Sequence, residues 1–345
     1  MRLARAEAAE PTHELPALHA HWIGGILPGP IPREKTATCG SCVMCDGPDF
    51  AARRDVWLFD PRAKCCTYHP NLPNFLVGAI LTDADSALDS ARAVLAARIE
   101  AGHQVSPLGI RAPLDYVTRF RDNPEGFGRR LDFTCPFYRL EDGACGVWRH
   151  RPAVCATWFC KHDRGAVGAT FWEALLALLS EVEGTMARSC AEALGAWPAE
   201  ERDAEAWGSW AGRVEEYYKE CARFQGRLAW SDIVARGGTE VERLAGVTRE
   251  AYARLIDPGL PERLRRGTIA LMEDNGGERV RVVGYSRRDP LELPAWLLDA
   301  LDSFDGGSPG EALSRVAAKT GRFIPSTLVR KLADFGLLEA VSSTD

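Results

Sequence analysis

The sequence predicts a mostly α-helical protein with a loop-rich, metal-binding cysteine lobe, one β-hairpin and a C-terminal winged-helix-like module. Nine of the 11 cysteines fall in two compact segments, apolar residues recur at helical spacing in the second half, and a hairpin is followed by three short helical patterns. We expect four parts: an extended arm over 1–35, a cysteine-rich metal-cluster domain over 36–165, a helical domain over 166–260, and the hairpin with its winged-helix-like module over 261–345.

The composition is that of an ordinary globular protein and excludes several classes. Hydrophobic residues make up 46% of the 345 residues and charged residues 26%, which argues against a disordered or fibrous chain. A net charge of -6 is unfavourable for a general nucleic-acid binder. The N-terminus shows no secretory signal, and the longest apolar run, 174–179, is too short to span a membrane. We therefore expect a cytoplasmic protein whose cysteines are reduced, which favours metal binding over disulfides.

The N-terminal arm is rich in proline and glycine between Pro16 and Pro32, which favours an extended segment lying on the body of the protein. His19, His21 and Trp22 are its residues of chemical interest. We interpret them as an aromatic anchor for the arm in preference to metal ligands.

The first cysteine segment reads Cys39-Gly-Ser-Cys42-Val-Met-Cys45. Two-residue intervals place successive thiols on the same side of a tight turn, where they can chelate one centre. This run matches three-quarters of a bacterial ferredoxin run, so a distant residue must complete the set. Cys65 and Cys66 are the candidates, and we expect one of them to ligate while the other serves a second centre or remains free.

A helix is expected over about 83–101, between the two cysteine segments. Thr82 can cap it, acidic residues follow at its positive end, and Gly102 can end it. Its expected buried face is formed by Leu88, Ala91, Leu95 and Ile99.

The second cysteine segment runs from Cys135 to Cys160 and contains a turn at 141–143 that returns the chain toward Cys145. Arg151-Pro152 favours a helix start, which places Cys155 near the positive end of a helix dipole, where a thiolate or an anionic cluster is stabilised. Five basic residues against three acids make the stretch from 135 to 164 locally cationic. Aromatic residues around it would limit solvent access to a metal centre.

These motifs resemble the CxxCxxCC zinc- or iron-chelating family of YkgJ type, over about residues 39–165. The second segment matches its pattern at Cys135-Pro136-Phe137, at Cys145, at Arg151-Pro152 with Cys155, and at Trp158-Phe159-Cys160. The first segment departs from it, because Asp46 stands where the family has a fourth cysteine and the double cysteine follows about 20 residues later. The resemblance implies a bound metal centre, often iron–sulfur, and a link to oxidoreduction or protein modification.

Two kinds of metal centre are compatible with these residues. Nine clustered thiols suit one or two iron–sulfur clusters, for which we expect the 4Fe-4S type, in a redox or peptide-modifying enzyme or its electron-transfer partner. The alternative is zinc that staples a non-catalytic binding module, and a metal-sensing regulator is a third, less favoured reading. The candidate ligands are Cys39, Cys42, Cys45, Cys65, Cys66, Cys135, Cys145, Cys155 and Cys160.

Three histidines lie close to these cysteines in the sequence. His69 follows the double cysteine and is the candidate catalytic residue, while His150 and His162 flank the second segment. Each can also be an ordinary hydrogen-bonded histidine. Motifs for nucleotide binding, serine hydrolysis or zinc proteolysis are absent from the sequence.

The second half of the chain is predicted to be helical. One helix ends near Gly195, an aromatic stripe from Trp207 to Phe224 marks another, and Cys190 and Cys221 behave as small apolar residues within them. A hairpin is expected over 268–283 with its turn at Asn275-Gly276, followed by three short helices. These last helices resemble PqqD-like winged-helix modules, which implies a peptide or protein partner; eight acids against five bases over 292–345 make DNA an unfavourable partner.

Overall fold

The computed structural model has about 53% of its residues in helices and only small antiparallel strand pairs, which confirms the mostly α class. Where one hairpin was expected, the described part of the chain holds four small antiparallel sheets, because residues far apart in sequence also pair. The structure describes residues 15–37, 39–40, 42–45, 58–197, 204–257, 259–274 and 278–341.

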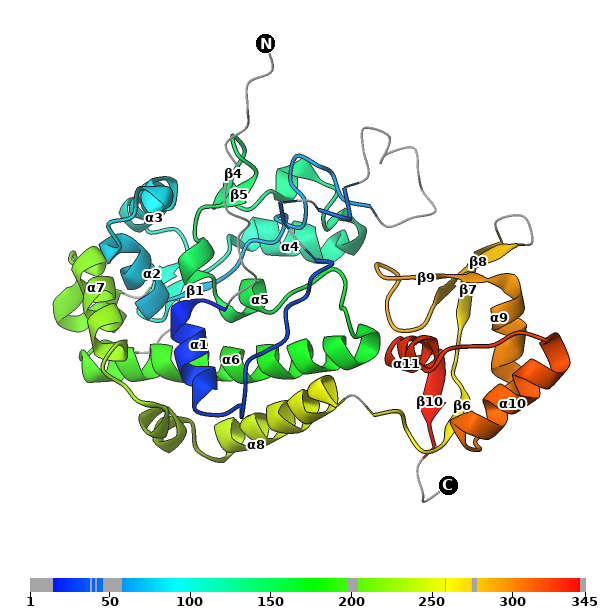
Figure 1. The fold of residues 1–345 in the computed structure, drawn as a ribbon. Helices are drawn as coiled ribbons and strands as arrows, with labels where there is room; N and C mark the ends of the chain where they lie inside the picture. The colour runs from blue at the N-terminus through cyan, green and yellow to red at the C-terminus, as the bar shows by residue number, and fades with distance from the viewer. Residues whose placement is uncertain are drawn as a thin grey trace, which may run out of the picture.

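The long helix α6 (Gly165–Ala193) is the axis of the larger, N-terminal unit (Figure 1). It packs most extensively against α8 (Trp230–Ile256), while α1 (Ala17–Gly24) crosses α6 in this view. On the other side α2 (Asn74–Thr82) packs against α7 (Val214–Gln225). The predicted helix ending near Gly195 is thus confirmed as α6.

Shorter elements complete this unit around the cysteine segments. The helices are α3 (Asp89–Ala101), α4 (Leu114–Asp122) and α5 (Ala153–Ala156), with 3₁₀ turns η1 (Ser86–Leu88), η2 (Pro124–Gly126), η3 (Leu131–Phe133), η4 (Trp148–His150) and η5 (Ala204–Trp210). The strands are β1 (Leu72–Pro73), β2 (Val105–Ser106), β3 (Gly109–Ile110), β4 (Tyr138–Arg139) and β5 (Ala144–Cys145), of which the first three form one sheet in the order β1-β3-β2.

One hydrophobic core runs through the whole N-terminal unit. It extends from Trp22 to Leu255 and includes residues from α2, α3, α6, α7 and α8. Residues on both sides of the boundary expected at 165/166 belong to this one core. The cysteine-rich part and the helical part therefore bury their apolar faces against each other. A second, separate core runs from Leu264 to Leu338.

The segment expected as an extended arm contains the helix α1, which is a correction to the sequence analysis. Pro16 is the N-cap of this helix and Gly25 is its C-cap, and the eight residues between them form two helical turns. Trp22 is fully buried and its ring meets Phe75 edge-on at 6.1 Å between centroids. The helix is therefore part of the core.

The helix expected over 83–101 begins later than predicted. Thr82 ends α2, which the sequence analysis missed, and Asp85 caps the turn η1 before α3 begins at Asp89. The C-terminal end is as expected, because Gly102 adopts a left-handed conformation with φ 61°. Of the predicted buried face, Ile99 is only partly buried.

The aromatic stripe from Trp207 to Phe224 is split between two elements. Trp207 and Trp210 lie in η5, and the regular helix α7 begins only at Val214. Gly208 has φ 52° and Gly212 has φ 77°, conformations that interrupt a right-handed helix.

The C-terminal unit consists of two small sheets and three helices. The predicted hairpin is confirmed as β7 (Ala270–Asp274) paired with β8 (Arg279–Val283), and its Asn275-Gly276 turn lies outside the described residues. The helices are α9 (Ala295–Ala300) with η6 (Leu301–Ser303), α10 (Pro309–Thr320) and α11 (Ser326–Asp334); β9 (Leu291–Pro294) pairs with β8, and β6 (Leu264–Arg266) with β10 (Leu338–Ala340).

The two units meet at the N-terminal end of α6 (Figure 1). Arg164 donates two hydrogen bonds of 2.7 Å to the two carboxylate oxygens of Asp334, at the end of α11. Asp334 also accepts from Arg330, so two guanidinium groups share one largely buried carboxylate. This arrangement fixes the C-terminal unit at the end of α6.

By length and composition alone, α6 is apolar enough to cross a membrane, whereas the sequence analysis found no run of that kind. Within its most apolar stretch 44% of the residues are buried inside the protein. The helix also carries the buried carboxylate of Glu183. Its apolar character therefore has an explanation in its place at the centre of the core.

Candidate metal centre

The structure brings all nine clustered cysteines into one neighbourhood, which we call the thiol nest. Cys65 is its hub, because its thiol interacts electrostatically with thiols from both cysteine segments. All 11 cysteines of the chain are free thiols. The nest consists of Cys39, Cys42, Cys45, Cys65, Cys66, Cys135, Cys145, Cys155 and Cys160.

Cys42 and Cys45 form the tightest part of the first segment. The amide of Cys45 donates to the carbonyl of Cys42 at 3.0 Å, which closes the turn that the spacing predicts. Their thiols hydrogen-bond to each other; this bond lowers the pKa of Cys42 to about 6 and raises that of Cys45. Cys42 is therefore the thiol of this pair that ionises first.

Lys64 ties three parts of the nest together. Its backbone is left-handed with φ 54°, a costly conformation for a residue with a side chain. Its Nζ donates to the carbonyls of Cys39 at 2.9 Å and Gly143 at 3.1 Å. These bonds hold the first segment and the 141–143 turn against the Cys65-Cys66 pair.

The double cysteine links the two segments directly. The thiols of Cys65 and Cys66 hydrogen-bond to each other. The backbone of Cys66 accepts a hydrogen bond of 2.8 Å from the amide of Cys135, the first residue of the second segment. The left-handed Lys64 immediately before them allows this sharp turn.

The second segment is positioned by a hairpin and by the short helix α5. Strands β4 and β5 pair Tyr138 with Cys145, and Gly143 in their turn has φ 66°, as expected for 141–143. The expected helix start at Arg151-Pro152 corresponds to α5, whose N-cap is Pro152. Cys155 lies in the first turn of this helix. The helix is anchored at its start because Ala153 donates to the Glu183 carboxylate at 2.8 Å.

A buried arginine lies among the thiols. Arg151 is 6% exposed, and its guanidinium lies 3.4 Å from the centroid of the Trp148 ring. Burial lowers its pKa, while four surrounding thiols act in the opposite direction: Cys145, Cys155, Cys39 and Cys66. A positive charge thus stands in the middle of groups that become negative when they ionise.

Burial keeps most of the other thiols protonated in the metal-free protein. Desolvation raises the pKa of Cys39 to about 11 and those of Cys135 and Cys160 to about 12. It also raises the pKa of Cys155. A metal must displace these protons, so its binding will release them to solvent.

Within the described residues, no group of three or more His, Cys, Asp or Glu side chains is arranged closely enough to hold a single metal ion as it stands. The close thiol contacts in the nest are pairwise, Cys42 with Cys45 and Cys65 with Cys66. The chemistry of the donor set nevertheless fits a thiolate-bound centre, because soft sulfur donors surround a buried cation.

The three histidines have partners outside the nest. The ring of His69 packs edge-on against Tyr116 and Phe137, and burial lowers its pKa to about 4. His150 Nε2 lies 2.8 Å from an oxygen of Asp83. These contacts give both histidines a structural role. A catalytic role of His69 stays a prediction.

His162 connects the nest to the C-terminal unit. Its Nδ1 lies 3.2 Å from the hydroxyl of Tyr285, and its backbone amide donates to Asp289 at 3.3 Å. Lys161 adds an ion pair of 3.2 Å with the same carboxylate. The loop between β8 and β9 is thereby held beside the residues that follow Cys160.

Sequence reasoning missed three residues of this site. Lys64 and Arg151 were interpreted only through their neighbours, and Glu183 was hidden in an apolar helical pattern. An excess of basic residues around the second segment was the one available signal for Arg151. No local pattern marks Glu183, because its partners His19 and Ala153 lie far away in the sequence.

Comparison with known proteins adds no assignment. No family model, curated protein or solved structure matches this chain.

Proposed function

We propose that the thiol nest binds one or two iron–sulfur clusters, of the 4Fe-4S type, and that the protein is a redox or peptide-modifying enzyme or its electron-transfer partner. The observation that carries this proposal is the convergence of nine free thiols, from two separate segments, around Cys65 and the buried Arg151. All-thiolate ligation is typical of such clusters. When bound, a cluster would supply one-electron chemistry.

Charge supports an anionic centre at this place. A buried guanidinium favours negative charge in its surroundings. Metal binding converts the ligating thiols to thiolates, which would place negative charge beside Arg151 and Lys64. Both cations already act electrostatically on Cys39.

The number of thiols favours a cluster over a single ion. One zinc ion takes four ligands, so it would use fewer than half of the nine thiols of the nest. One or two clusters with all-thiolate ligation account for more of them.

Zinc is the second candidate, favoured by the Cys42–Cys45 pair. This CxxC turn is already formed, and the pKa of Cys42, at about 6, makes one thiolate available at neutral pH. In that case the zinc ion would hold the two cysteine segments together, and the protein would act as a non-catalytic binding module. A metal-sensing regulator remains the third and least favoured proposal.

A peptide or protein partner is proposed for the C-terminal unit. Its three helices and the β7–β8–β9 sheet suit a winged-helix-like module. Phe323, on the loop between α10 and α11, is 80% exposed and offers an apolar contact. The ion pair of Lys161 with Asp289 holds the β8–β9 loop of this unit beside the residues that follow Cys160.

We place this function in the cytoplasm, which is supported by the free state of all 11 cysteines. The deciding measurement is metal analysis of the protein purified without oxygen. We expect a brown product with broad visible absorption that yields iron and acid-labile sulfide. A colourless product with stoichiometric zinc selects the second candidate, and a product without either metal refutes both.

A further inference from the structure

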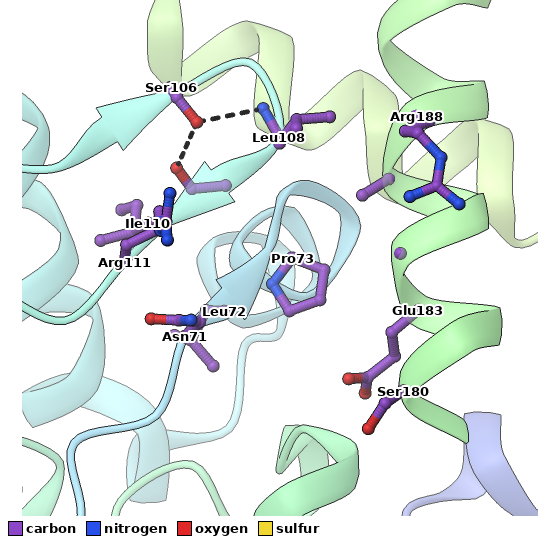
Figure 2. A pocket seen from close by; sticks show the side chains of 13 residues that line it. Asn71, Leu72, Pro73, Ser106, Leu108, Ile110, Arg111, Ser180, Glu183 and Arg188 are labelled. Carbon is purple, nitrogen blue, oxygen red and sulfur yellow. Dashed lines mark hydrogen bonds between the residues drawn. The ribbon is translucent and has the colours of Figure 1, made fainter. Parts of the chain in front are cut away.

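A pocket of about 290 Å³, whose lining contains no cysteine, lies between the β1-β3-β2 sheet and α6 (Figure 2). Pro73 and the β2–β3 turn form one wall, and α6 forms the other. The helix leaves room because it presents Gly184 and Ala187 to this space. Polar groups line both ends of the α6 wall, so the pocket is suited to a small polar ligand.

Glu183 supplies a buried carboxylate to this pocket. The residue is only 7% exposed, and Figure 2 shows its carboxylate directed from α6 toward β1. Oε1 accepts a hydrogen bond from the Ala153 amide at 2.8 Å, and His19 Nε2 lies 2.9 Å from it. Oε2 has no hydrogen-bond partner among the described residues. A buried carboxylate with a free oxygen favours a cation in the adjacent space.

A positive group stands further along the same helix. Arg188 lines the pocket five residues after Glu183, while Ser180 lies beside the carboxylate. The guanidinium bonds to Glu181 at 3.3 Å and Thr185 at 3.2 Å, and its side chain is 51% exposed. Arginine has five N–H donors, so these two contacts leave it able to bind a carboxylate.

We propose that this pocket binds a free α-amino acid, with its ammonium group on Glu183 and Ser180 and its carboxylate on Arg188. Glu183 and Arg188 are five residues apart on α6, so their backbone positions are separated by about 7.5 Å along the helix axis. An amino acid carries a cationic and an anionic group on the same carbon, so it can offer one charge to each of these two side chains. The ligand therefore needs both charges, and a monovalent amine or acid would satisfy only one end.

The first test measures binding of free L-α-amino acids to the full-length protein by thermal shift and calorimetry. For an amino acid that binds, the N-acetyl and carboxamide forms each remove one charge. We expect each modification to weaken binding about tenfold or more. The absence of binding by any free amino acid at millimolar concentration overturns the proposal, as does equal binding of the modified forms.

Two variants locate the site on the protein. Glu183→Gln should abolish binding, but it also alters the anchor of α5. Gly184→Leu fills the pocket and leaves Glu183 intact, since a β-carbon at this position meets only Arg188 Nη1, at 3.3 Å. We expect it to abolish binding while the protein stays folded and keeps its metal content.

Arg249→Met is the matched control, because Arg249 is exposed on α8 and does not line the pocket. It should bind the amino acid as the unmodified protein does. Unchanged binding by Gly184→Leu refutes this location. Metal content is measured in every sample, so failure of the pocket proposal is distinguishable from failure of the iron–sulfur proposal.

Discussion

Replacing Cys155 with alanine removes a thiol of the nest, whereas the same change at Cys190 removes a thiol that lies elsewhere in the core. Cys190 is a fully buried residue of α6, and its thiol donates to the carbonyl of Cys221 in α7 at 3.6 Å. Its loss should cost about 1 kcal/mol of stability, the value of one small buried apolar group. Cys155→Ala should cost the same for packing and more for the lost metal ligand.

The additional cost follows from the metal affinity. If loss of one ligand weakens metal binding about a hundredfold, the metal-bound protein loses about 2.7 kcal/mol of stability. We therefore expect Cys155→Ala to lower the free energy of unfolding by about 4 kcal/mol, against about 1 kcal/mol for Cys190→Ala. Urea denaturation measures both values, in the metal-bound protein and after chelation under reducing conditions.

The chelated samples provide the critical comparison. Without metal, the two variants should differ by less than about 1 kcal/mol, because only the packing contribution remains. A difference of about 3 kcal/mol that persists after chelation would show that Cys155 acts through packing. Equal, small effects in the metal-bound protein would contradict its assignment as a ligand.

Three further predictions concern the rest of the molecule. Asp334→Asn leaves the guanidinium of Arg164 without its counter-charge and should weaken docking of the C-terminal unit by about 3 kcal/mol, detected as faster proteolysis between the units; unchanged protection would contradict this role. Gly78→Ala should destabilise the protein by about 3 kcal/mol or more in urea titrations, since the new β-carbon would lie 1.8 Å from the carbonyl oxygen of Tyr218, and a neutral effect would refute the close packing of α2 on α7. The pKa of His69, lowered by burial from 6.5 to about 4, makes its contribution to stability complete above pH 6.5 and lost as the pH falls toward 4; His69→Phe should therefore reduce the loss of stability over this range, and an identical acid-unfolding profile would contradict it.

The helices and strands whose sequence pattern lies within the element itself could be predicted from the sequence. The regular apolar spacing of α6 and the alternating pattern of β7 and β8 fix those elements through neighbouring residues alone. Gly102 ends α3 because only glycine adopts its left-handed conformation at little cost. The convergence of the two cysteine segments was also expected, although the ligand assignments remain predictions.

Elements that depend on distant contacts could not be predicted. The helix α1 forms in a proline-rich stretch because its buried face meets the core, and the bond from His19 to Glu183 joins residues 164 positions apart. Strands of two residues, such as β1 and β3, carry no periodicity at all. The place of Arg151 among the thiols likewise follows from the fold of the whole unit.

The pairing of β6 with β10 determines the order in which the protein can be completed during its synthesis. Leu264 pairs with Ala340, so the C-terminal unit cannot close until its last strand has left the ribosome. The core of the N-terminal unit ends at Leu255 and can form earlier. Until the loop carrying Asp289 has been synthesised, Lys161 and the backbone amide of His162, which directly follow Cys160, are without this carboxylate partner.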